Sequence, residues 1–390
     1  MDLYRKNILL IIHQGSLGGA ERQGLGMSKI LTEGYKCKVD VLLTFSEELN
    51  KEFKDYAEAC KVNEILYYGP TYLNFPKSFK LKELKRLKWT VEYLLRLRNN
   101  LKPKHYEIII PFLNFPSKVA FYLYKLLPGV KFTFWHYLGL DRFNNDLFER
   151  IAIKNTPCII ANADDGLHVF RNHYKLNSEK LFVLPQYLSM ELREADPIKI
   201  KRKYNIPENK VVIGMIAHYR PEKLQDLLLD TFLDLLKDFK DIHLIFLGNK
   251  EISNTADLKF KSIAEKIQED NFSDNVSLLS GENVQEVLSA MDIGVLVSEI
   301  EGMPNSVMEY MLYSLPVVTT AHSGCRTLLG NSEFLIQNNP SDLKIALTKL
   351  LKSSELRKLE GELNAAKIKN FTKETYISKL QEIIDKTTRK

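Results

Sequence analysis

Two glutamates, Glu301 and Glu309, mark the part of this chain best suited to bind a ligand rich in hydroxyl groups. They follow an apolar run, residues 293–297, and the Pro-Asn-Ser stretch between them is typical of a helix start. Glu301 is therefore expected in the loop at the carboxyl end of a strand, and Glu309 in the first turn of a helix. Carboxylates placed there accept hydrogen bonds from sugar or ribose hydroxyls, although a capped helix with two exposed acids would show the same pattern. The residues whose backbone amides are expected to face the same ligand are Gly302, Met303, Pro304, Asn305 and Ser306.

A pair of cations, Arg220 and Lys223, is the second candidate, directly after the apolar run 211–217. In open α/β sheets, ligands bind at the carboxyl edge of the strands. Arginine offers a bidentate fork to phosphate oxygens and lysine a point charge, so the pair suits a diphosphate leaving group. The alternative is two solvated surface cations.

Gly18 and Gly19 lie in a glycine-rich turn, residues 13–22, between an apolar run and a helical pattern. Such glycines let the backbone approach a ligand closely, and the amides of a helix N-terminus attract phosphate. The turn does not contain the G-x-G-x-x-G dinucleotide fingerprint. The alternative is an ordinary tight turn between a strand and a helix, which would have the same sequence pattern. His136, directly after the aromatic run 132–135, is a further candidate, although a lone histidine in such a place is more often structural.

Short runs rich in β-branched residues alternate with helical patterns in both halves of the chain. This alternation predicts βαβ units and parallel sheets, and the continuous apolar character of the runs indicates helices on both faces. The expected strands are residues 7–12, 37–44, 107–111, 131–135 and 158–161, and then 211–217, 243–248, 276–279, 293–297 and 316–319. The expected fold class is thus α/β, with two doubly wound, Rossmann-like parallel-sheet domains in tandem.

The length also favours two domains, because 390 residues exceed the roughly 250 to 300 at which one hydrophobic core stops growing. A polar stretch without a strand pattern separates the two halves and is interpreted as a hinge. The expected parts are a first domain (1–190), the hinge (191–208), a second domain (209–366) and a C-terminal helix with one buried face (367–390).

The composition describes a compact globular chain, with 45% hydrophobic and 27% charged residues and no low-complexity tract. No apolar run reaches the roughly 18 to 20 residues that a membrane-spanning helix needs. The four cysteines are scattered, without metal-binding or disulfide spacing, which favours a reducing cytoplasm.

The positive charge is concentrated in residues 77–104, which contain ten Lys and Arg and two Glu. The formal charge of this stretch is about +8, whereas that of the whole chain is +6, so the remaining residues sum to about −2. A uniformly basic nucleic-acid binder would look different, so no nucleic-acid partner is expected. Aromatic residues among cations suit the headgroup region of an anionic membrane, so association with the inner face of a membrane is a hypothesis, and a solvated helix face is the alternative. One expected face holds Leu81, Leu84, Val91 and Leu95, and another holds Lys82, Lys85, Arg86, Trp89, Tyr93 and Arg96.

In content and order, these segments resemble the family 4 glycosyltransferases of the GT-B fold. That family shows a G-G-A-E-R turn after the first strand, a basic R/K element early in the second domain, and an E-x7-E motif followed by an apolar strand. Here the three read G-G-A-E-R at 18–22, R-P-E-K at 220–223 and E-G-M-P-N-S-V-M-E at 301–309. The resemblance implies two domains that face each other across a cleft, a C-terminal helix packed back on the first domain, and transfer with retention at the anomeric carbon.

Carried over residue by residue, the resemblance implies that Arg220 and Lys223 hold the diphosphate of a donor and that Glu309 binds its ribose hydroxyls. Glu301 would meet the donor sugar. His136 matches a histidine that in many members reaches the same sugar from the other domain.

The sequence contains no Asp-x-Asp, the usual metal-holding signature of the other large glycosyltransferase fold. Arg220, Lys223 and helix amides would then balance the leaving group, so transfer without a metal or other cofactor is expected from a UDP- or GDP-linked donor. The expected enzyme is a hexosyltransferase that acts on a glycan or lipid-linked hydroxyl in cell-surface polysaccharide or glycolipid synthesis. The alternatives are a non-catalytic nucleotide-sugar-binding subunit and another GT-B enzyme, such as a sugar-nucleotide epimerase.

Overall fold

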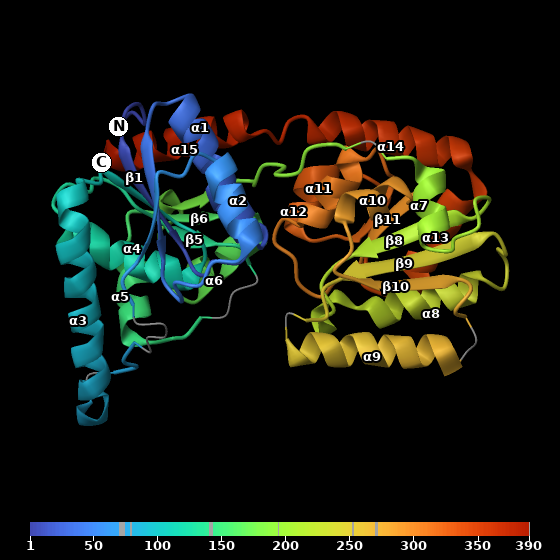
Figure 1. The fold of residues 1–390 in the computed structure, drawn as a ribbon, viewed down its shortest axis with the longest axis horizontal. Coiled ribbons are helices and arrows are strands. Elements are labelled where there is room, and N and C mark those ends of the chain that lie inside the picture. The colour runs from blue at the N-terminus through green and yellow to red at the C-terminus, as the bar shows by residue number, and fades with distance from the viewer. Residues whose placement is uncertain are drawn as a thin grey trace. The chain divides into compact units, whose positions relative to one another are not determined.

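The computed structural model describes residues 1–69, 75–78, 80–139, 143–193, 195–251, 253–269 and 272–389. The chain divides into two compact units (Figure 1). Unit 1 comprises Met1–Ser189 and Thr372–Lys390, and unit 2 comprises Met190–Phe371. Phe79, within the basic segment 77–104, lies outside the described residues.

Unit 1 is built on a parallel sheet of order β3-β2-β1-β4, followed by a smaller parallel sheet of order β5-β6-β7. An isolated parallel bridge between Ile108 and Phe132 joins β4 to the segment before β5. The central strand β1 is buried over nearly its whole length, because helices cover both faces of the sheet. The strands are β1 (Asn7–Ile12), β2 (Lys38–Leu43), β3 (Glu64–Tyr67), β4 (Ile108–Pro111), β5 (Trp135–Tyr137), β6 (Ile159–Ala161) and β7 (Leu181–Val183).

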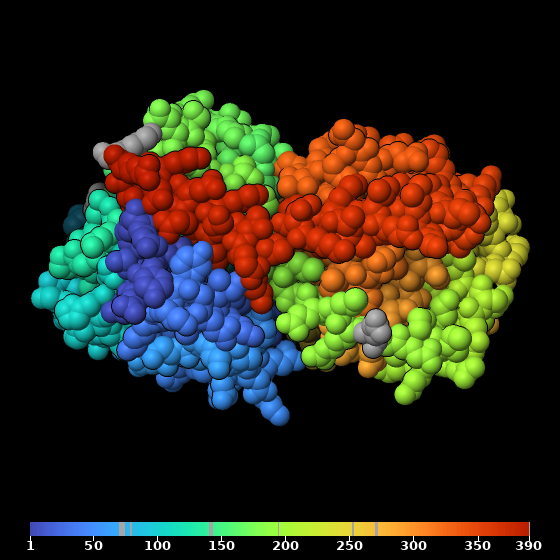
Figure 2. Space-filling view, turned by 90° about the horizontal axis from the view of Figure 1, so that it is seen from above, coloured from blue at the N-terminus to red at the C-terminus, as the bar shows by residue number. Residues whose placement is uncertain are grey.

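The C-terminal helix α15 (Lys373–Thr388) belongs to unit 1, where its buried residues join the core of the first sheet. The amino group of Met1 pairs with Asp385 at 2.7 Å, and Figure 2 shows the red C-terminal segment against the dark blue N-terminal residues. The other helices of unit 1 are α1 (Gly19–Glu33), α2 (Lys51–Ala59), α3 (Leu84–Leu101), α4 (Asn114–Leu126), α5 (Leu147–Asn155) and α6 (His168–Asn172).

Unit 2 has one parallel sheet of order β10-β9-β8-β11-β12-β13. Numbered within the unit, this order is 3-2-1-4-5-6, the doubly wound order of dinucleotide-binding folds. The prediction of an α/β chain with two Rossmann-like parallel-sheet domains is therefore confirmed. The strands are β8 (Val211–Ile216), β9 (Ile242–Gly248), β10 (Val276–Ser280), β11 (Ile293–Leu296), β12 (Val317–Thr320) and β13 (Leu335–Ile336), and the helices are α7 (Pro197–Lys203), α8 (Gln225–Leu235), α9 (Asn254–Glu269), α10 (Val284–Ser289), α11 (Asn305–Leu312), α12 (Ser323–Leu329), α13 (Pro340–Lys352) and α14 (Ser354–Ile368).

The strand expected at residues 131–135 is displaced. Phe132 makes only a bridge, and the ladder forms at Trp135–Tyr137, where the backbone pairs with β6. The short strands β3, β7 and β13 were not predicted, because each has few residues and is made by pairing with a neighbour rather than by a long apolar pattern.

Residues 191–208, interpreted as a hinge, contain a helix that groups with unit 2. Asp196 caps α7, Ile200 is buried, and Lys203 pairs with Glu286 of α10 at 2.6 Å. At the other end, the C-terminal helix begins at Lys373 rather than at 367, since Thr372 caps it.

The faces of α3 differ from the expectation. Its buried residues are Thr90, Tyr93, Leu94, Leu97 and Leu101. The row of Leu84, Val91 and Leu95 is exposed to solvent, whereas Tyr93, expected on the basic face, is buried in the core. The helix α3 has apolar residues on two faces, and its packing against α4 decides which of them is covered.

Candidate functional site

The strands β8 and β11 mark the point in unit 2 where the strand order reverses. They pair at Ile293–Ile213 and Gly294–Gly214, and further along the hydroxyl of Tyr310 bridges them. This hydroxyl accepts a hydrogen bond from the Ile216 amide at 2.7 Å and donates one to the Val295 carbonyl at 3.2 Å. A Cβ on Gly294 would lie 2.5 Å from the ring, so the glycine is required for this fit. Tyr310 thereby anchors α11 at the edge where ligands bind in such sheets.

The acidic segment has the expected form, with one correction. Glu301 is buried in the loop after β11, and Pro304 is the N-cap of α11. Because the helix begins at Asn305, Glu309 lies in its second turn and not in the first.

The basic loop and the acidic loop contact each other. Lys223 forms a largely buried ion pair with Glu301, and the amide of Glu299 donates to the carbonyl of Glu222 at 2.9 Å. Arg220 lies on the same loop with its side chain 48% exposed, 3.9 Å from Glu222. The structure thus joins Lys223 to Glu301, and it leaves Arg220 directed outward.

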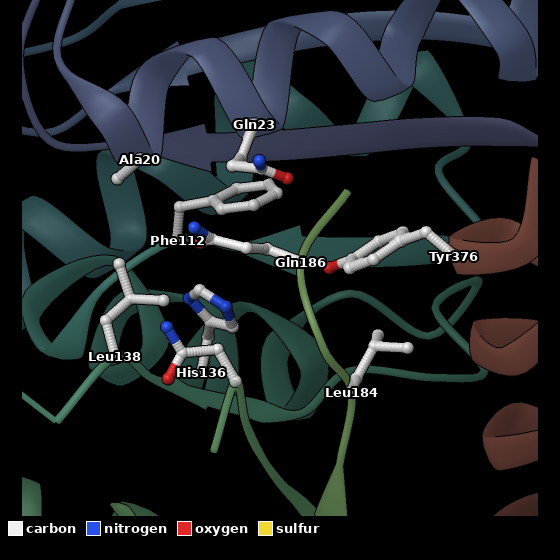
Figure 3. A pocket seen from close by; sticks show the side chains of 9 residues that line it. Ala20, Gln23, Phe112, His136, Leu138, Leu184, Gln186 and Tyr376 are labelled. Carbon is white, nitrogen blue, oxygen red and sulfur yellow. The ribbon is translucent and has the colours of Figure 1, made fainter. Parts of the chain in front are cut away.

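In unit 1, Gly18 is the N-cap of α1 and Gly19 its first residue. A Cβ at Gly18 would lie 2.7 Å from a carboxylate oxygen of Glu21, which can move away because it is at the end of a flexible side chain. The helix start packs near His136, since Ala20 and Gln23 line the same pocket as the histidine (Figure 3).

His136 is the middle residue of β5 and is buried. The amide of Leu113 donates to its Nδ1 at 3.3 Å; Leu113 has φ +77°, a strained conformation of the kind found at functional sites. Since Nδ1 accepts, the ring proton resides on Nε2. Burial lowers the pKa of His136 to about 4, so the imidazole is neutral at pH 7.

We expect NMR of histidine-labelled protein to show His136 as the Nε2–H tautomer, with a midpoint near pH 4. Because this pKa lies below the unfolded value of 6.5, the unfolded state binds the proton first, and stability is lost as pH falls from about 6.5 to 4. The loss is about 3 kcal/mol. A His136→Gln variant assigns the resonance. A midpoint near 6.5, or a protonated Nδ1, would contradict the assignment.

Replacement of Tyr310 by phenylalanine should lower the free energy of unfolding by about 1 to 3 kcal/mol, because the Ile216 amide and the buried Val295 carbonyl lose their partner. Tyr313 of the same segment is the matched control, since its hydroxyl bonds the Arg193 carbonyl in an exposed position. Denaturant unfolding followed by circular dichroism compares Tyr310→Phe with Tyr313→Phe. Equal effects would show that Tyr310 does not anchor α11.

Several polar residues of these regions were not singled out from the sequence, namely Gln23, Asn162, Gln186 and Tyr310. Asn162 directly follows a predicted strand, and the rule that ligands bind at the carboxyl edge would have selected it. Gln23 and Tyr310 lie within helices, where one sequence gives no signal that distinguishes them from other buried residues.

Residues 196–364 match the family model described as glycosyl transferases group 1. An uncharacterised glycosyltransferase of Methanocaldococcus jannaschii is 24% identical over 216 residues, 53% of this chain and 51% of the relative. The N-acetyl-alpha-D-glucosaminyl L-malate synthase of Bacillus anthracis is 22% identical over 73% of this chain and 75% of its own length. The alignments with the first curated relatives span about half of their length.

Among solved structures, Anabaena HepE in complex with UDP-glucose matches with a TM-score of 0.77 at 16% identity, over 98% of this chain and 100% of the other. A glycosyltransferase from Rickettsia africae matches with a TM-score of 0.78 at 15% identity, over 98% of both chains. These structural matches establish the fold. The family match, at residues 196–364, lies within unit 2.

Proposed function

We propose that this chain, which carries a group 1 glycosyl transferase domain, is a hexosyltransferase that moves a sugar from a nucleotide-diphosphate donor to a hydroxyl of a glycan or lipid-linked acceptor. The observation that carries the proposal is the contact between the basic and acidic loops in unit 2, at Lys223 and Glu301. Glycosyl transfer needs a cation for the leaving diphosphate beside a group that orients the sugar. The family match includes both loops.

In this proposal, Arg220 and Lys223 bind the diphosphate, and Glu309 accepts hydrogen bonds from the ribose hydroxyls. Glu301 accepts a hydrogen bond from a hydroxyl of the donor sugar, through the carboxylate oxygen that is not paired with Lys223. His136 of unit 1 contributes its neutral Nε2–H to a sugar hydroxyl. The donor is UDP- or GDP-linked, and the complexes of HepE with UDP-glucose support this class.

The reaction is proposed to need no metal, because Arg220, Lys223 and the amides at the start of α11 neutralise the leaving group. Retention at the anomeric carbon and a role in cell-surface polysaccharide or glycolipid synthesis belong to the same proposal. They rest on the resemblance of the motifs at 18–22, 220–223 and 301–309 to family 4 enzymes.

A screen of nucleoside diphosphates and their sugars tests the proposal. A ligand at about 100 times its dissociation constant stabilises the folded state by about 2.7 kcal/mol, which raises the melting temperature. The donor that gives the largest rise is then incubated with glycan and lipid-linked acceptors, with EDTA added in parallel. Consumption of the donor in EDTA is expected. Binding without consumption in any mixture would favour a non-catalytic subunit, and conversion of the donor sugar without an acceptor would favour an epimerase.

We also propose that α3 associates with the anionic inner face of a membrane, where a lipid-linked acceptor is presented. No helix in the described ranges is long and apolar enough to cross a membrane. The first turns of α3 extend past the rest of unit 1 (Figure 1). Its exposed apolar side chains alternate with exposed cations, each worth about 1 kcal/mol near an anionic surface. The exposed apolar residues are Leu84 (51%), Trp89 (49%), Val91 (44%) and Leu95 (46%) in α3, and Leu81 (84%) in the short 3-10 turn before it.

Flotation with phosphatidylglycerol vesicles at low salt tests the association. The intact protein is expected to float with these vesicles, and to remain soluble with phosphatidylcholine vesicles. Leu84→Ser with Trp89→Ser should abolish flotation, whereas Leu359→Ser with Leu363→Ser, two exposed leucines of α14, should not. Intact protein that stays soluble in the presence of anionic vesicles would show that the surface is only solvated.

A further inference from the structure

The loop between β8 and α8, residues 217–224, contains a histidine that the proposed function does not use. His218 lies two residues after the end of β8, at the edge of the sheet where the strand order reverses. Its side chain is exposed, the ring of Tyr219 is fully buried, and Arg220 is exposed again. Residues two apart in an extended backbone point to the same side, so His218 and Arg220 share the outer side of this loop.

Two side-chain contacts hold the backbone that carries the His218 ring. The side-chain amide of Gln225, a residue that is 1% exposed, donates to the His218 carbonyl at 2.9 Å. The Tyr219 hydroxyl donates to the Leu279 carbonyl in β10. The imidazole therefore extends from a well-anchored backbone at the carboxyl edge of the sheet.

Charged groups of both signs surround this loop. The loops after β9 and β11 lie on either side of it, because these strands flank β8 in the sheet. The charged residues of the loop and of the elements around it are Arg220, Glu222 and Lys223 on the loop, Asp226 on α8, Lys250 and Glu251 after β9, Glu299 and Glu301 after β11, and Glu309 on α11. Two of these, Arg220 and Lys223, act on the His218 ring through their charge.

The two cations of the loop are each close to a carboxylate. Lys223 pairs with Glu301, and Arg220 lies 3.9 Å from Glu222, so these four charges cancel. Partial burial lowers the pKa of His218, and the positive charges of Arg220 and Lys223 lower it further. The imidazole is therefore neutral at pH 7, and these five residues have no excess positive charge until an anion arrives.

We infer that His218 is a third cation for the diphosphate of the donor: it takes up a proton as the nucleotide sugar binds, and donor binding is tighter at low pH. The inference rests on the proposed function, which supplies the diphosphate. An opposite charge nearby favours the charged form of a titratable group, so the anion stabilises the imidazolium that Arg220 and Lys223 disfavour in the free protein. Since proton binding and donor binding are linked, each strengthens the other by the same factor.

Calorimetry at neutral pH measures this coupling directly. UDP-glucose, UDP-N-acetylglucosamine and GDP-mannose are titrated separately into the intact protein, in buffers with different heats of ionisation, and inorganic pyrophosphate is titrated in parallel. The dependence of the binding heat on the buffer gives the number of protons taken up. The nucleotide sugars do not titrate near neutral pH themselves, because both ends of the diphosphate are esterified. We expect wild-type protein to take up a fraction of one proton on binding, and His218→Asn to lack this uptake.

The dissociation constants give a second measure. Between about pH 8 and about pH 5.5, across the range in which histidine gains its charge, the dissociation constant of wild-type protein should fall roughly tenfold. It should change little in His218→Asn. His218→Lys has a charge that does not depend on pH in this range, so it should bind at the higher pH about as tightly as wild-type protein does at the lower one. His168→Asn is the matched control, since His168 is an exposed histidine of unit 1, and should behave like wild-type protein.

The outcomes separate the inference from the proposed function. If a nucleotide sugar binds and His218→Asn takes up as many protons as wild-type protein, His218 is a solvated surface residue and the proposed function stands. If only pyrophosphate binds, with a proton uptake that depends on His218, the third cation is confirmed but the diphosphate does not come from these donors. If none of the four ligands binds to the intact protein, both the inference and the assignment of the diphosphate to this loop are wrong.

Discussion

Replacement of Glu301 by glutamine is expected to lower sugar transfer roughly 100-fold while nucleoside diphosphate binding is preserved. The physical reason is the ion pair with Lys223, in which the carboxylate side chain is 3% exposed and the ammonium side chain 14% exposed. Glutamine keeps the shape but no longer neutralises Lys223, so the cation becomes more available to the diphosphate. The dissociation constant for UDP or GDP should therefore stay the same or fall, as calorimetry would show.

Lys223→Met is the complementary variant. It removes a charge-assisted contact worth about 1.5 to 3 kcal/mol, so the dissociation constant of the nucleoside diphosphate should rise about 10- to 100-fold. Equal losses of nucleotide binding in Glu301→Gln and Lys223→Met would contradict the division of roles, because the pair would then act as one structural unit. Lys250→Met, outside both loops, controls for a general loss of positive charge.

Replacement of Lys118 by methionine is expected to destabilise unit 1 by about 3 to 5 kcal/mol, because two buried carboxylates lose their cation. Lys118 of α4 is fully buried; it pairs with Asp146 and lies 3.8 Å from Glu149. Burial is the main reason why the pKa of Glu149 is raised, and the positive charge of Lys118 acts against this rise. The measurement is urea unfolding followed by tryptophan fluorescence, since the only tryptophans of the chain, Trp89 and Trp135, are both in unit 1.

Lys125→Met on the exposed side of α4 is the control and should cost less than about 1 kcal/mol. The loss of unfolding free energy in Lys118→Met should become smaller as pH falls, because an acid whose folded pKa is raised binds its proton first in the folded state. Adding Glu149→Gln should recover part of the loss at pH 7 for the same reason. If Lys118→Met folds and loses less than about 1 kcal/mol of unfolding free energy, the charge of Lys118 does not stabilise the buried carboxylates of Asp146 and Glu149.

The elements that could be predicted from sequence are those with local signals. The strands β8, β9 and β11 are short apolar runs, and the start of α11 has Pro304 before a helical pattern. Residue type and spacing likewise placed Glu301 in a loop at a strand end. These features depend on backbone propensity and periodicity, which neighbouring residues determine.

The helix α3 shows where this reasoning fails. Its two apolar rows are alike in sequence, and Tyr93 was expected on the basic face. The structure covers the row that contains Tyr93 and Leu97, because that row meets α4. The exposed apolar surface proposed for membrane association is therefore a result of tertiary packing.

From the sequence alone, this protein is an α/β chain with two Rossmann-like domains whose basic and acidic motifs follow strands of the second sheet. Only the tertiary structure joins Lys223 to Glu301, places the Tyr310 hydroxyl between β8 and β11, and gathers Gln23, His136 and Asn162 around one pocket. Such contacts join residues far apart in the chain, and their formation depends on which helix faces pack and which polar groups find partners. A local pattern contains neither kind of information.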